Sequence, residues 1–216
     1  MNAHVFRLIF CGFIFTGILP FTAFCDNQTK EFPEYHCRLT LPNEAWSWDE
    51  SLDIPNLFAL AESPKGYLFL FGAIVYNGNF PVNDKFIVGL EKGRLAQPEV
   101  IKKGGRKLTY CGVPCYEFET FMGETNMNSI ARYINGHGYS FCLELLYPKG
   151  QEIEASLVKN IFEGFVFIKS PTYTSSTESS AHKEGQYIGR IVGHLFFWSI
   201  LLYAAYAIIK KIFPKK

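Results

Sequence analysis

The sequence predicts an α+β domain in which two helices pack on an antiparallel sheet, set between an N-terminal export signal and one C-terminal transmembrane helix. Three observations predict this arrangement. Short runs rich in Phe, Tyr, Ile and Val are separated by Gly, Pro and Asn through the middle of the chain, a pattern typical of strands and turns. Two segments there repeat apolar residues at helical spacing. Each end of the chain carries an apolar run that is poor in charge.

Composition limits the domain count and the kind of partner. The chain has 216 residues, of which 48% are hydrophobic and 17% aromatic, enough for one domain with a real core. The formal net charge is +1, from 21 basic and 20 acidic side chains. Because this leaves no basic excess to concentrate around a phosphate backbone, we expect no nucleic-acid partner.

Residues 1–25 have the parts of a signal peptide. Arg7 precedes an apolar run over Leu8–Leu19, which is shorter than the roughly 20 residues that a spanning helix needs. Ala23 and Cys25 stand at the −3 and −1 positions of a cleavage site before Asp26. An uncleaved anchor and a lipid-modified Cys25 are the alternatives, and the bulky Phe24 disfavours the second.

The domain predicted over residues 26–169 is rich in strands. Tyr67–Tyr76 is apolar on both faces, which is typical of a central strand covered on each side. Cys115–Phe121 alternates instead, with Glu117 and Glu119 on one face, so we expect that face to be wet. The predicted strands are Tyr35–Leu41, Leu57–Glu62, Tyr67–Tyr76, Lys107–Cys111, Cys115–Phe121, Asn128–Asn135, Ser140–Tyr147 and Phe165–Lys169.

Two helices and one tight hairpin complete the predicted domain. Asn83 or Asp84 caps a first helix that runs to Ala96. Glu152–Glu163 forms a second, apolar on one stripe, and Gly164 ends it. The segment Asn-Gly-His-Gly at 135–138 supplies the positive-φ residues that a tight hairpin requires.

This order of elements resembles the PsbP-like sandwich, which the Mog protein and a group of exported bacterial proteins of unknown role also have. The resemblance rests on YHCRLTLP, EAWSWDE, GVPCYEF, GYSFCLELLYP and FEGFVFI, and it covers about 35–169. It is a likeness in element order and weak positions, and it transfers no individual site residue. Members of that fold mostly act as binding or assembly modules, so the resemblance implies a protein without catalysis.

The C-terminal part is predicted to join the domain to the membrane. Residues 170–186 are rich in Ser and Thr and almost free of apolar side chains, which predicts a flexible linker. Ile191–Ile209 carries no formal charge, which predicts a transmembrane helix over 187–210. Lysines dominate the tail at 211–216, so we expect that tail in the cytoplasm and the domain outside.

Three residues of the predicted span invite a further interpretation. Gly189 and Gly193 form a small-xxx-small pair through which two copies of the helix could form a weak homodimer. His194 lies near the start of the span, and we interpret it as a neutral imidazole at the interface rather than a proton or metal site.

Four cysteines remain after signal removal: Cys37, Cys111, Cys115 and Cys142. An even number in an oxidising compartment predicts one or two disulfides, and three full pairings are open. Cys111 can reach Cys115 only if the Gly-Val-Pro between them folds into a tight turn, and Cys115 with Cys142 is the rival pair.

Other candidate sites are weaker. Cys111, Cys115, Cys142 and His137 could hold a metal or act in redox chemistry, but their spacing departs from zinc motifs, so we expect no metal and no cofactor. Glu117 and Glu119 could pair as in glycoside hydrolysis, but no other catalytic motif accompanies them, so we assign no catalytic residue.

Trp46 and Trp48 lie on the same side of an extended segment. They could form an aromatic binding platform for a sugar, a peptide or a lipid headgroup. The simpler interpretation is that both tryptophans are core residues that pack at the edge of the sheet.

The sequence thus predicts a single-pass membrane protein that faces the periplasm or the cell exterior. We expect a non-catalytic binding or assembly module with a protein or envelope partner. The alternative is a cell-surface hydrolase, or a thiol-redox or metal-handling protein, that uses the Cys and Glu side chains.

Overall fold

The computed structural model describes residues 28–43, 45–49, 57–76, 78–110, 112–174 and 180–194. The predicted signal peptide, most of the predicted transmembrane helix and the predicted cytoplasmic tail lie outside these residues. Within them, the predicted α+β architecture with antiparallel sheets is confirmed, although the strands form two sheets instead of one.

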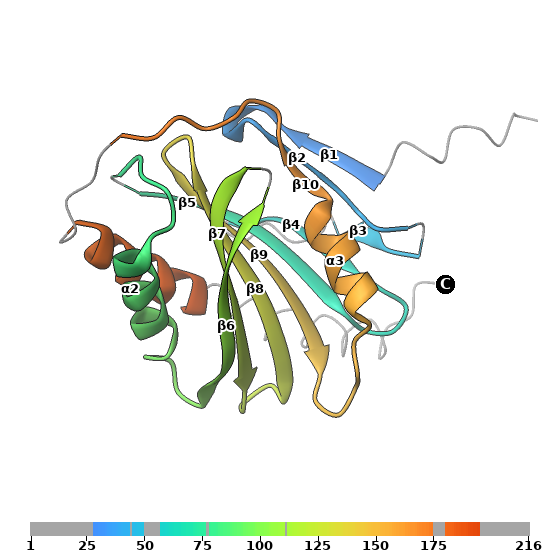
Figure 1. Ribbon diagram of the computed structural model, residues 1–216. Helices are drawn as coiled ribbons and strands as arrows, with labels where there is room; N and C mark the ends of the chain where they lie inside the picture. Colours follow the sequence, from blue (N-terminus) through green and yellow to red (C-terminus); the bar gives the residue numbers. More distant parts are fainter. Residues whose placement is uncertain are drawn as a thin grey trace, which may run out of the picture.

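A seven-stranded antiparallel sheet forms the middle layer (Figure 1). β5 lies inside this sheet between β4 and β9 and is buried on both faces up to its last residue, as its unbroken apolar sequence predicted. In spatial order the strands are β3 (Ser47–Asp49), β4 (Leu57–Glu62), β5 (Leu68–Val75), β9 (Tyr139–Pro148), β8 (Met127–Gly136), β7 (Val113–Met122) and β6 (Val100–Tyr110).

The hairpin between β8 and β9 has the tight turn that the sequence predicted. Gly136 pairs with Tyr139, and the two residues between them have positive φ, 54° at His137 and 81° at Gly138. Such a pair of left-handed residues matches the twist of the flanking strands, which keeps β8 and β9 in register over their full length.

A second, three-stranded antiparallel sheet has the order β1 (Thr29–Phe32), β2 (Cys37–Thr40) and β10 (Phe165–Phe167). The 3-10 turn η2 (Pro33–Tyr35) joins β1 to β2. The closing strand predicted at Phe165–Lys169 therefore pairs with the opening strand, far away in sequence, instead of with the large sheet.

Helices cover both faces of the large sheet. α3 (Ala155–Glu163) and the small sheet share one core with it, in which Leu39, Phe162 and Phe165 are buried. α2 (Asp84–Arg94) and a helix over residues 180–194 share the other core, in which Phe86, Leu90 and Ile188 are buried. Figure 1 shows α2 beside this last helix on one side of the sheet, and α3 on the other.

The described part of residues 170–186 differs from the flexible coil that the sequence predicted. The Tyr173 hydroxyl donates to the Asn135 carbonyl at 2.8 Å, and the Thr174 amide donates to the Asn79 carbonyl at 2.6 Å. Residues 180–186 begin the last helix. Only this first part of the helix was not predicted from the sequence, because its buried residues are Ala181 and Gly185, which carry little or no apolar side chain.

Glycines bring α2 and the helix of residues 180–194 into contact. A Cβ atom at Gly89 would lie 2.1 Å from the His182 carbonyl oxygen, and one at Gly189 would lie 2.3 Å from the Leu90 carbonyl oxygen. The close approach expected of Gly189 and Gly193 is therefore made within one chain, by Gly189 against α2 and by Gly193 against the Gln97 side chain that follows α2. A homodimer through these glycines remains a prediction.

In the described part of the chain, no helix is long and apolar enough to cross a bilayer. Residues 187–194, the first part of the predicted transmembrane helix, lie in the helix that packs on α2. The charge-free remainder, 195–209, lies outside the described residues.

Candidate ligand pocket

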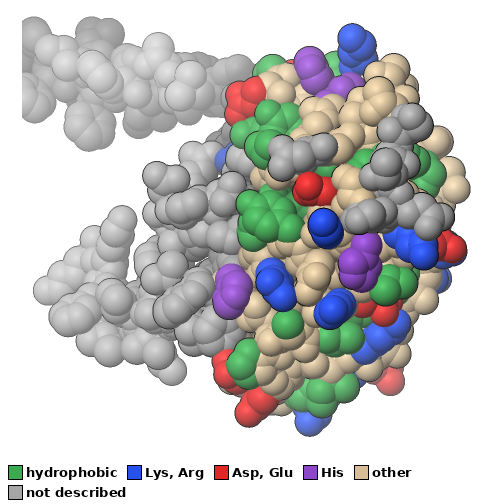
Figure 2. Space-filling model, turned by 90° about the vertical axis from the view of Figure 1, so that its left-hand side faces the viewer, with side chains coloured by type: hydrophobic (Ala, Val, Ile, Leu, Met, Phe, Trp, Pro, Cys, Tyr) green, Lys and Arg blue, Asp and Glu red, His purple; other side chains and the backbone are tan. Residues whose placement is uncertain are grey.

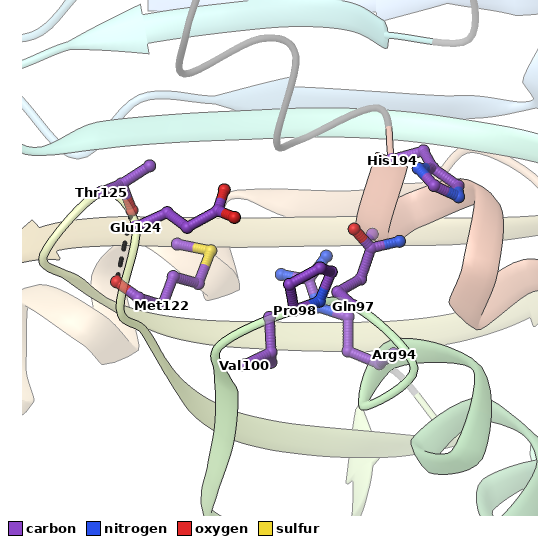
Figure 3. A pocket seen from close by; sticks show the side chains of 9 residues that line it. Arg94, Gln97, Pro98, Val100, Met122, Glu124, Thr125 and His194 are labelled. Atoms are coloured by element: carbon purple, nitrogen blue, oxygen red, sulfur yellow. Dashed lines mark hydrogen bonds between the residues drawn. The ribbon is translucent and has the colours of Figure 1, made fainter.

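A pocket of about 290 Å³ opens where four segments meet: the end of α2, the start of β6, the turn between β7 and β8, and the end of the helix over residues 180–194 (Figure 3). Strand pairing brings two of these segments together, because Val100 at the start of β6 pairs with Met122 at the end of β7. The residues that line the pocket are Arg94, Gln97, Pro98, Val100, Met122, Glu124, Thr125, Gly193 and His194.

The turn between β7 and β8 forms one wall. The Gly123 amide donates to the Glu99 carbonyl at 3.0 Å, which ties this turn to the segment that follows α2. Asn126 has a φ of 54°, a left-handed conformation that asparagine tolerates better than most residues and that reverses the chain here. Figure 3 shows Glu124 and Gln97 on opposite sides of the pocket, with Met122 below Glu124.

Arg94 forms the inner wall and is 1% exposed. Its guanidinium makes an ion pair with Glu144, which is fully buried on β9, and the Ser129 hydroxyl donates to the same carboxylate. The second carboxylate oxygen, Oε2, has no hydrogen-bond partner within the described residues. The ion pair thus anchors the end of α2 to the centre of the sheet.

Burial dominates the electrostatics of this cluster. It raises the pKa of Glu144, and Arg94 and Ser129 offset only part of that rise. Burial alone would lower the pKa of Arg94, but the neighbouring Glu144 carboxylate holds it above its ordinary value. Burial also raises the pKa values of Tyr133 and Cys142, which lie against each other beside the pair. Arg94 and Glu144 therefore form a buried ion pair in which each group favours the charged form of the other.

The pocket can bind an apolar group that ends in a hydrogen-bonding function. Val100 and Met122 supply an apolar wall, while Gln97, Glu124 and His194 supply polar groups. Pockets of this composition bind by burying apolar surface and use a few polar groups to orient the ligand.

Sequence reasoning did not find this pocket. Of its lining residues only His194 and Gly193 were singled out, and neither for this role. Arg94 carried a usable signal, because it continues the buried stripe of α2 in place of an apolar residue. A charged residue on an apolar stripe predicts a buried partner.

The face predicted to be wet on β7 is buried at its centre. Glu117 is 1% exposed and accepts hydrogen bonds from the Nε atoms of Arg106 at 2.7 Å and Arg132 at 2.8 Å. The Arg132 guanidinium lies 4.5 Å from the centre of the Phe162 ring on α3. The prediction was wrong because α3 covers this face. The ion pairs with the two arginines offset the cost of removing the carboxylate from water.

The predicted disulfide cysteines do not gather at one place. Cys37 and Cys142 are free thiols. Cys115 and Cys142 lie on β7 and β9, with β8 between them, and they belong to the cores on opposite faces of the sheet. The rival pair Cys115 with Cys142 is therefore not formed. Cys111 lies outside the described residues, so a bond between it and Cys115 stays a prediction.

We expect Cys37 and Cys142 to be unreactive in the folded protein. Burial, followed by the nearby Glu34 carboxylate, raises the pKa of Cys37 to about 12, so only about one thiol in ten thousand is ionised at pH 8. Iodoacetamide labelling at pH 8 followed by peptide mass spectrometry should find both residues unmodified in the native protein and modified after unfolding in urea. Rapid labelling of either thiol in the native protein would contradict this expectation.

The two tryptophans do not form an exposed pair. Trp46 is 3% exposed within the core beneath α3, and the half-buried Trp48 packs against the same core, with the Lys30 ammonium 5.2 Å from its ring centre. His137, the remaining residue of the candidate metal set, has its Nε2 atom 2.8 Å from the Lys169 carbonyl oxygen. Among the described residues no group of three or more His, Cys, Asp or Glu side chains is arranged to hold a metal ion.

Comparisons with known proteins identify the fold. The chain is similar to the solution structure of cyanobacterial PsbP (CyanoP) from Synechocystis, with a TM-score of 0.51 and 11% identity, over 65% of this chain and 91% of that one. A Bacteroides thetaiotaomicron crystal structure matches less well, with a TM-score of 0.39 and 12% identity, over 66% of this chain and 49% of that one. The protein therefore has a PsbP-like α/β fold, as the element order predicted.

Neither of the other two comparisons yields a relative. No family model matches the sequence, and no curated protein matches it.

Proposed function

We propose that this protein is a non-catalytic binding or assembly module, located outside the cytoplasm and held at the membrane by its apolar C-terminal segment. In this proposal the pocket at the end of α2 receives an apolar group of the partner. The observation that carries the proposal is the position of the pocket. It is lined by Gly193 and His194, and the charge-free run 195–209 follows them directly in sequence.

The state of the reactive side chains favours binding over catalysis. The carboxylates of Glu117 and Glu144 are buried in ion pairs with arginines. Cys37 and Cys142 are buried thiols with raised pKa values. A hydrolase or a thiol-redox enzyme needs such groups exposed to substrate and with pKa values suited to proton transfer or attack. The PsbP-like fold is compatible with a binding role but assigns no partner.

Filling the pocket should block binding of the partner. We expect p-benzoylphenylalanine placed at Thr125, on the pocket wall, to form a discrete photo-crosslinked adduct in native membranes. Val100→Trp should reduce the adduct about tenfold, because the indole would occupy the space of the ligand. The adduct is measured by immunoblotting, and the attached molecule is identified by mass spectrometry.

The neighbouring residue provides a matched control. Ile101 follows Val100 on β6 but is 59% exposed and does not line the pocket, so Ile101→Trp should leave the adduct unchanged. Near-ultraviolet circular dichroism of both variants establishes that they fold. If both folded variants retain the adduct, or if no adduct forms at Thr125, the pocket is not the binding site.

A further inference from the structure

The two helices that cover the sheet beside the pocket run in parallel. Gly89 and Gly93 of α2 face residues 182–190 of the other helix, and the contact advances along both helices in the same direction, so that Phe86 meets Gly185 and Leu90 meets Gly189. The helices contact each other through their glycines, and their apolar side chains pack on the sheet. Their remaining sides form one continuous outer surface, which we call the helix-pair face.

Carboxylates of both helices turn away from the helix-pair face. Glu91 accepts from Lys102 of β6 at 2.6 Å and from the Tyr116 hydroxyl of β7. Asp84 pairs with Lys107 of β6. Glu184 is half-buried and close enough to the buried Tyr76 to raise the pKa of its hydroxyl. Each of these acidic groups is thus directed toward the sheet or its edge.

The helix-pair face itself is basic and apolar. Lys85 and Lys92 lie seven residues apart on α2, and Lys183 and Arg190 lie seven residues apart on the neighbouring helix, so each pair shares one side of its helix. All four side chains are exposed.

Exposed apolar side chains lie between these cations. Val88 is 57% exposed, Leu95 36% and Tyr187 52%. Figure 2 looks onto this side of the molecule and shows Lys, Arg and His side chains distributed among hydrophobic ones, with some Asp and Glu side chains among them. A surface that mixes cations with apolar and aromatic groups matches the headgroup region of an anionic bilayer.

The C-terminal segment would hold this face near a membrane. Residues 191–194 belong to the helix packed on α2, so they are not available to span a bilayer. A helix over the remaining charge-free run, 195–209, would be about 22 Å long, shorter than the roughly 30 Å of hydrocarbon. Because this run follows His194 directly in sequence, a short anchor would draw the domain onto the headgroups.

We propose that the helix-pair face docks onto a bilayer of anionic phospholipids. Lys85, Lys92, Lys183 and Arg190 contact lipid phosphates, while Val88, Leu95 and Tyr187 enter the interface. This inference rests on the proposed anchoring of the chain at a membrane. It adds the kind of bilayer that is bound and the face of the domain that contacts it.

The test uses the full chain with the fluorescent residue dansylalanine placed at Tyr187, reconstituted into vesicles. We expect quenching by the neutral aqueous quencher acrylamide to fall about threefold in vesicles containing about 30 mol % phosphatidylglycerol, relative to pure phosphatidylcholine. High salt should reverse this protection, because it screens the attraction between the cations and the lipid phosphates. Lys92→Glu with Arg190→Glu should abolish it.

A second pair of substitutions controls for net charge. Lys65→Glu with Lys159→Glu changes the charge equally, but these residues lie on the side of α3, so protection should persist. Equal quenching in both lipid compositions would overturn the docking proposal. Protection by soluble polyglutamate but not by vesicles would overturn it as well, because it would assign the face to an acidic protein segment.

Extraction of the same vesicles with alkaline carbonate tests anchoring separately. Release into the supernatant would refute the anchor, whereas the quenching measurement still reports whether the face binds anionic lipid.

Discussion

Replacing Arg94 by methionine should destabilise the protein by about 3–5 kcal/mol at neutral pH, because it leaves the Glu144 carboxylate buried without its partner. Methionine keeps the unbranched apolar stem of the side chain but removes the charged guanidinium, so we expect most of the loss to be electrostatic. Urea unfolding of the full chain in detergent solution, followed by tryptophan fluorescence, measures the change in the free energy of unfolding.

The pH dependence distinguishes a lost ion pair from a packing defect. Burial already raises the pKa of Glu144, and removing Arg94 removes the main influence that lowers it. The folded variant should therefore bind a proton on Glu144 more readily than the unfolded chain, so its stability rises relative to the natural protein as the pH falls. A deficit that stays constant between pH 7.5 and pH 5 would contradict the electrostatic account.

Replacing both partners provides the control for Arg94→Met. In the double variant with Glu144→Leu no buried charge remains at this site, so most of the lost stability should return. A double variant that is no more stable than Arg94→Met would show that the ion pair is not the cause of the loss.

Gly93→Ala should destabilise the protein by about 1–3 kcal/mol, although alanine is the better helix former by about 1 kcal/mol. The added Cβ would lie 2.4 Å from the Gln186 carbonyl oxygen and 2.9 Å from the Arg190 amide nitrogen. Both are backbone atoms that move only if the helices separate. The midpoint of thermal unfolding of the full chain measures the effect.

An exposed position on the same helix controls for Gly93→Ala. Val88→Ala removes a side chain that is largely in solvent, so it should change stability by no more than about 0.5 kcal/mol. Gly93→Ala with unchanged or higher stability would contradict the close packing of the two helices.

Local patterns were reliable wherever one segment carries its own signal. The apolar run at 67–76 predicted the central strand β5, and the left-handed residues at 137 and 138 predicted the turn between β8 and β9. β1 and β3 were missed because they are short and partly exposed, and their hydrogen bonds come from segments distant in sequence. The first part of β6 was missed because Lys and Gly dominate its exposed face.

The candidate site could not be predicted in the same way, because four separate segments build the pocket. Val100 and Met122 meet through strand register, and Gly193 and His194 reach the same place only because glycines let their helix approach α2. At Glu117 the local pattern was misleading. The alternation of its strand predicted a solvent-exposed face, but α3 packs over that face and buries the carboxylate.

The sequence by itself therefore determined the element types, most of their order and the PsbP-like fold, because hydrophobic periodicity and turn residues act within one segment. The tertiary structure alone decided which charges are buried, that Cys115 and Cys142 lie in opposite cores, and how residues 180–194 attach to the domain. Those outcomes depend on long-range pairing and on the fit of one helix against another, and neither leaves a local pattern in the sequence.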